Sequence, residues 1–199
     1  MEPTTGTTIS VTWWDIARFA LTTGLVTALF NQGIGWFRDW RKESTVTIRD
    51  ATYAAMRIAV LLEAFAMECA SLIEENAFAE KSGGPSTLKL PSLSEYPTDI
   101  DWKSLDSSLA AQSLSIRNEL RLSVRTIAFW SGEEPAEIPS VCSNQAGKCG
   151  YRAWQLATAL RRHYKLPSFD PTQGSWDLVG TLQKRHDAVI KAVTPTDMA

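Results

Sequence analysis

Apolar residues recur three and four positions apart over long stretches of the chain, which is the period of an α-helix with one buried face. The longest such pattern runs from Val46 to Glu80 and predicts a single helix. The positions of its apolar seam are Ile48, Ala51, Ala55, Ile58, Leu62, Phe65, Cys69 and Leu72. Charge is confined to a narrow stripe through Arg49, Asp50, Arg57 and Glu63. Because a dimeric zipper needs more flanking charge, we predict the central helix of a bundle, with Ile58, Leu62, Phe65 and Leu72 among its most buried residues.

Glycine and proline mark where this helix ends. The run Ser82-Gly-Gly-Pro85 predicts a stop, because glycine permits a left-handed cap and proline cannot continue the turn. Prolines 85, 91 and 97 then make residues 85–101 an irregular connection. We expect this segment to lie across the bundle and to bury its apolar side chains, Leu88, Leu90, Leu93 and Tyr96.

The second half of the chain predicts three further helices. Asp106 or Ser107 caps the first, whose apolar positions are Leu109, Ile116, Leu120, Val124, Ile127 and Trp130. A loop containing Pro135, Pro139, Cys142 and Gly147 leads to a helix from about Cys149 to Tyr164, with Ala153, Leu156, Ala157 and Leu160 on one face. Arg161, Arg162 and Lys165 at its end are predicted to remain solvated and to complement the helix dipole. The last helix is expected from a Ser175 cap to about Val193, before Pro195.

No stretch has a convincing strand pattern, so the predicted fold class is all-α, a helical bundle over residues 44–194 built on the long central helix. Residues 1–12 and 195–199 are expected to be flexible tails.

A separate apolar helix is predicted from residue 13 to residue 43. Trp14 and Trp36 would lie roughly 33 Å apart along a helix, close to the ~30 Å hydrocarbon thickness of a bilayer. Tryptophans at both margins and cations beyond one of them are typical of a spanning helix, and the predicted anchor residues are Trp13, Trp14, Trp36, Trp40, Arg38, Arg41 and Lys42. Arg18, Asn31 and Gln32 interrupt the run, so the alternatives are a helix buried in a soluble bundle or one lying in the membrane interface.

Two further expectations depend on this helix. Cations follow the apolar run and do not precede it, so the positive-inside bias places the N-terminus outside and the C-terminal body in the cytoplasm. The spacing of Ala20, Gly24 and Ala28 is the small-xxx-small pattern that lets helix backbones approach closely, and it predicts self-association.

Composition narrows the classes of function. The net charge of −2 does not favour nucleic-acid binding, and three cysteines, Cys69, Cys142 and Cys149, fit a reducing compartment better than a disulfide framework. Nothing in the sequence identifies a small-molecule ligand.

The sequence assigns no catalytic, cofactor-binding or metal-binding residue. Cys142 and Cys149 stand too far apart for a paired-cysteine redox or zinc motif. His163 and His186 lack the Glu-x-x-His spacing of a di-iron bundle and are predicted at the surface, and the adjacent Glu74 and Glu75 are predicted to be solvated.

Two hypotheses of function follow from these patterns. The first is a membrane-anchored, non-enzymatic helical interaction module, a sensor, regulator or scaffold that presents a cytoplasmic bundle to a partner. The second is a soluble α-helical enzyme or effector with an unrecognised active site and a buried first helix. The tryptophan-flanked run favours the first hypothesis.

Overall fold

The computed structural model describes the backbone of residues 13–171 and 176–193, and the side chains of residues 48–171 and 176–191. The described chain is all-helical, with the elements α1 (Trp13–Ser82), α2 (Ser107–Glu133), the short 3₁₀ helix η1 (Pro135–Glu137), α3 (Ile138–His163) and α4 (Leu178–Val193). The predicted all-α class is therefore confirmed. The chain divides into two units, Met1–Thr47 and Ile48–Ala199, and the second contains the helical bundle.

The helix α1 is continuous over 70 residues. One helix was expected to end at residue 43 and the next to begin at residue 46, but α1 has no interruption there, since residues 43–47 include neither proline nor glycine. Its C-terminus matches the prediction. Gly83 has φ = +68°, and the Gly84 N–H donates to the Ala79 carbonyl (3.0 Å), which together make a left-handed glycine cap.

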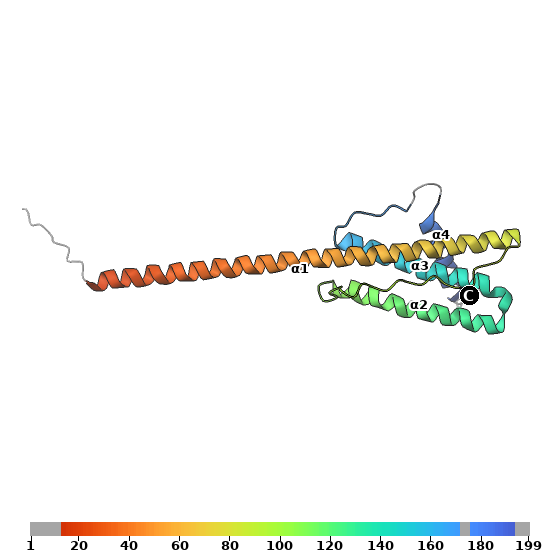
Figure 1. Ribbon diagram of the computed structural model, residues 1–199, viewed down its shortest axis with the longest axis horizontal. Helices are drawn as coiled ribbons and strands as arrows, with labels where there is room; N and C mark the ends of the chain where they lie inside the picture. The colour runs from red at the N-terminus through yellow and green to blue at the C-terminus, as the bar shows by residue number, and fades with distance from the viewer. Residues whose placement is uncertain (1–12, 172–175, 194–199) are drawn as a thin grey trace, which may run out of the picture. The chain divides into compact units, whose positions relative to one another are not determined.

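Residues 85–101, here called the return segment, run back along the bundle from the end of α1 (Figure 1). Contacts place Thr87 beside Asn76 and Asp99 beside Arg57, so the segment is antiparallel to α1. The helix α2 then starts at the far end of the bundle and runs parallel to α1. As predicted, Asp106 caps α2: its carboxylate accepts from the backbone N–H groups of Ser108 (3.1 Å) and Leu109 (3.0 Å).

The helix α3 begins at Ile138, eleven residues before its predicted start near Cys149, so the predicted loop is wrong. Pro139 occupies the first turn, where a missing N–H costs nothing. Gly147 and Gly150 serve close helix packing instead of a loop. A Cβ atom on Gly150 would lie 2.7 Å from both Cys69 Cβ and Leu182 Cδ2, so this glycine lets α1 and α4 approach α3 closely.

The helix α4 packs on α3, which also packs against α2 and α1, so α3 contacts all three other helices. The predicted cap Ser175 lies outside the described residues. Asp177 caps α4 in the structure, since its carboxylate accepts from the Gly180 N–H (2.9 Å) and its carbonyl accepts from the Thr181 N–H (3.0 Å).

The core forms where these helices meet, and its most buried α1 residues include the predicted set, Ile58, Leu62, Phe65 and Leu72. The α3 face is also confirmed, with Ala153, Leu156, Ala157 and Leu160 all buried. Two helix residues that were expected in the core are exposed instead: Ile48 is 66% exposed, and Val124 of α2 is 50% exposed. These residues have the same helical period as the buried apolar residues, so only the packing of the bundle shows which of them are covered.

Candidate functional site

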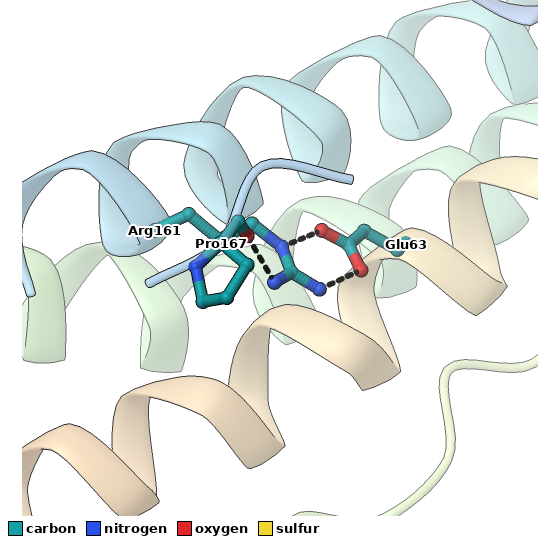
Figure 2. Close-up of polar contacts among 3 residues, drawn as sticks. All are labelled: Glu63, Arg161 and Pro167. Carbon is teal, nitrogen blue, oxygen red and sulfur yellow. Dashed lines mark hydrogen bonds and ion pairs between the residues drawn. The ribbon is translucent and has the colours of Figure 1, made fainter. Parts of the chain in front are cut away.

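A buried ion pair joins α1 to the C-terminal end of α3 (Figure 2). The Arg161 guanidinium donates from Nε to Glu63 Oε1 (2.5 Å) and from Nη2 to Glu63 Oε2 (2.8 Å). Its Nη1 donates to the Pro167 carbonyl (2.7 Å), which also holds the chain beyond α3. The side chains are only 6% and 15% exposed for Glu63 and Arg161. Neither placement was predicted: Glu63 is buried instead of lying in a charged surface stripe, and Arg161 is partly buried instead of solvated.

The chemistry of this pair is structural. Both carboxylate oxygens are engaged by one guanidinium, and the hydrogen bond to Glu63 raises the pKa of Arg161 above its ordinary value. The pair fixes the position of α1 along α3, because a charge left alone in the core would be costly.

The return segment is held at both ends by polar contacts. The Asn76 side chain donates to the Thr87 carbonyl (3.0 Å) and accepts from the Thr87 N–H (2.7 Å), as a neighbouring strand would. At the other end, Arg57 bonds Asp99 (2.8 Å), and this hydrogen bond lowers the pKa of Asp99. The segment is therefore fixed against α1 at its two ends.

The middle of the return segment is fixed against α2. The Tyr96 hydroxyl donates to the Ser113 carbonyl (2.8 Å), and Arg117 donates to the Ser94 carbonyl (2.7 Å) while its guanidinium lies 4.7 Å from the Tyr96 ring centroid. Burial raises the pKa of Tyr96 to about 12, with a smaller opposing effect of Arg117. Leu90 and Leu93 point into the core, as predicted. The segment is thus a preformed wall beside α2.

Between this wall and α2 lies an open groove, here called the α2 groove. It contains two hollows of about 430 and 330 Å³ that share Lys89, Leu90 and Val124. Leu120, Val124 and Ile127 of α2 line it, opposite residues 88–93 of the return segment. The predictions that Leu88 and Val124 are buried are both wrong, since each is 50% exposed at this groove. The apolar positions that line the groove are visible in the sequence, but their periodicity does not distinguish a groove from the core.

The two arginines of the groove lie at one end, whereas Lys89 lines both hollows. Lys89, Arg121 and Arg125 line the larger hollow, and no aspartate or glutamate lines either hollow. A shallower hollow of about 660 Å³ lies between the return segment and α1, and it carries Glu68 and Glu75 as well as Lys89. Of these two surfaces, only the α2 groove combines an apolar lining with charged residues that are all cationic.

The three cysteines lie in the core as free thiols. Burial raises the pKa of Cys69 well above its ordinary value, raises that of Cys142 to about 11, and raises that of Cys149 despite its contact with Ser123 (Sγ to Oγ, 3.2 Å). Thiols with raised pKa values are weak nucleophiles. The three thiols therefore pack in the core as small apolar side chains do.

Other candidate groups are dispersed. His163 is exposed, as predicted, whereas His186 is half-buried beside Tyr151 and bonded to Asp187 (3.1 Å). Glu74 and Glu75 are exposed, as predicted. Within the described residues, no three histidine, cysteine, aspartate or glutamate side chains are grouped so that they could hold a metal ion.

The predicted anchor and self-association residues belong to a part of α1 whose side chains lie outside the described residues. They are Trp13, Trp14, Trp36, Trp40, Arg38, Arg41 and Lys42 for the anchor, and Ala20, Gly24 and Ala28 for self-association. In the part of the chain that the structure describes, no helix combines the length and the hydropathy required to cross a bilayer.

Comparison with known proteins adds no family to this description: no family model, curated protein or solved structure matches the chain.

Proposed function

We propose that this chain is a helical interaction module that binds a protein partner in the α2 groove. The observation that carries the proposal is the groove itself: an open, largely apolar surface with a preformed wall, in which Leu88 and Val124 remain half-exposed. Apolar side chains gathered in a concave surface mark binding sites, because a partner that covers them removes apolar area from water.

The test of this role uses photo-crosslinking in cells that express the full chain. A benzophenone side chain replaces Leu88 or Ser131 at the groove, and in matched controls it replaces exposed Lys103 or Lys184 away from it. We expect adducts from the groove positions that disappear when Val124→Asp is added, because a charge in the apolar floor opposes docking. Equal adducts from groove and control positions, or none from the groove, would contradict the role.

We also propose that residues 13–43 anchor the module in a membrane, with the N-terminus outside and the bundle in the cytoplasm. Support comes from the sequence alone: tryptophans at both margins of the apolar run and the cations Arg38, Arg41 and Lys42 after it. Fractionation with a carbonate wash, performed with and without residues 1–43, tests the anchor. Release of the intact full chain by carbonate would count against a spanning helix and favour a helix lying in the interface or buried in a soluble bundle.

Orientation is tested with a reporter fused after Ala199. Replacing Arg38, Arg41 and Lys42 with glutamine should reduce the fraction of molecules with the reporter in the cytoplasm, since the positive-inside bias is removed. An unchanged distribution would show that these cations do not set the orientation.

Self-association through the first helix is the remaining part of the proposal. Gly24→Ile places a branched side chain where two backbones would meet, and it should lower the yield of crosslinked dimer in membranes. Ala20 and Ala28 would lie on the same face, one turn away on either side. Unchanged dimer yield would contradict an interface at this face.

A further inference from the structure

The α2 groove has a charge pattern that selects among protein partners. Arg121 and Arg125 are exposed at one end of it, Lys89 is exposed where its two hollows meet, and among the described residues none of the three forms an ion pair. The whole chain carries a net charge of −2, so this cluster of one sign is a local feature of the groove. Unpaired cations beside an apolar floor complement a ligand that is apolar along one side and acidic at one end.

We propose that the partner enters the α2 groove as an extended peptide segment, with apolar side chains between Leu88 and Val124 and acidic side chains beside Arg121 and Arg125. This inference rests on the proposed function and adds the chemistry of the partner. The apolar contacts supply affinity by burying exposed area, while the carboxylates fix direction and exclude basic or neutral sequences.

The backbone of the return segment favours an extended peptide. Its polar contacts to the bundle are near its ends and at Ser94 and Tyr96, and no backbone-to-backbone hydrogen bond involves residues 88–93 of the described chain. A peptide lying alongside can therefore pair with these backbone groups as an added strand does. Pro91 removes one donor from this edge and limits the length of any such pairing.

The concave shape of the α2 groove favours a peptide over a membrane surface as its occupant. Leu90 and Ile127 are almost fully buried and form the base of the groove beneath the half-exposed Leu88 and Val124. An occupant must insert side chains into the hollows to cover this base, which a flat layer of headgroups does not do. An anionic membrane would instead depend on the exposed cations alone.

Selection from a displayed library of randomised peptides on the purified full chain tests the inference. We expect the enriched peptides to combine aspartate or glutamate with leucine, isoleucine or phenylalanine. Their affinity should fall about tenfold or more in Arg121→Glu/Arg125→Glu, because attraction becomes repulsion at two contacts, and it should weaken as salt is raised. Lys103→Glu/Lys184→Glu changes the net charge equally at exposed positions outside the groove and should leave the affinity unchanged.

The outcomes separate this inference from the proposed function. Peptides that lose binding in Val124→Asp but show no acidic preference would overturn the acidic partner and keep the groove as a binding surface. Enrichment of no peptide that depends on Val124 would overturn both. A fluorophore attached to Ser92→Cys reports occupancy of the groove directly, and labelling is selective because the native thiols are buried. A fluorescence change with phosphatidylserine vesicles that depends on Arg121 and Arg125, together with no change on adding the selected peptides, would overturn the peptide and identify an anionic membrane as the occupant.

Discussion

Removing one partner of the buried Glu63–Arg161 pair should destabilise the bundle far more than removing a neighbouring surface charge. Arg161→Met leaves the Glu63 carboxylate in the core without either of its guanidinium bonds (2.5 and 2.8 Å). Breaking a buried pair in this way typically costs about 3–5 kcal/mol. Because Arg161 is 15% exposed, water can reach part of the site, and we expect the lower end, about 3 kcal/mol.

The assay is urea or thermal unfolding of the full chain, followed by circular dichroism of the helices. For a domain of this size, a loss of about 3 kcal/mol should lower the midpoint temperature by roughly 6–12 °C. The matched control is Arg162→Met, which removes the adjacent, exposed arginine and should change the free energy of unfolding by less than about 0.5 kcal/mol.

A double variant tests whether the cost comes from an unpaired charge. In Glu63→Leu/Arg161→Met both charges are replaced by apolar side chains, and the loss should be smaller than that of Arg161→Met alone. The pKa of Arg161 is raised in the folded state, so this contribution is fully present below the ordinary arginine pKa and is lost only at higher pH. Measurements near neutral pH are therefore sufficient. Equal effects of Arg161→Met and Arg162→Met, or simple additivity in the double variant, would refute the reasoning.

Three further predictions concern packing and titration. Gly150→Ala places a Cβ atom 2.7 Å from atoms of α1 and α4 and should lower the free energy of unfolding by about 1–3 kcal/mol. The control is Gly132→Ala, whose new Cβ atom would have no neighbouring atom within 4 Å, and it should be neutral or slightly stabilising. Equal urea midpoints for the two variants would contradict this. Tyr96 should titrate near pH 12, as followed by its absorbance near 295 nm. Because its pKa is raised in the folded state, the free energy of unfolding that it contributes declines as pH rises from about 10 to 12. Tyr96→Phe should abolish this absorbance step. Phe65→Ala should cost about 3–5 kcal/mol in the same unfolding assay, and a loss below 1 kcal/mol would show that this buried ring is not tightly packed.

The helical fold and its main core face were determined by the sequence alone. A three- and four-residue repeat of apolar side chains specifies a helix with one buried face, which is why Ile58, Leu62 and Phe65 could be assigned to the core. Local capping chemistry is equally readable: Gly83 ends α1 and Asp106 begins α2 because each satisfies backbone groups within a few residues of itself.

The tertiary structure alone decided which charges are buried and which apolar residues are not. Glu63 and Arg161 stand 98 residues apart in the chain, and no local pattern links a carboxylate to a guanidinium over that distance. Val124 has the same helical phase as buried neighbours, yet it faces a groove because the return segment packs beside it and not over it. Periodicity reports which side of a helix is apolar, while the arrangement of the other segments determines whether that side is covered.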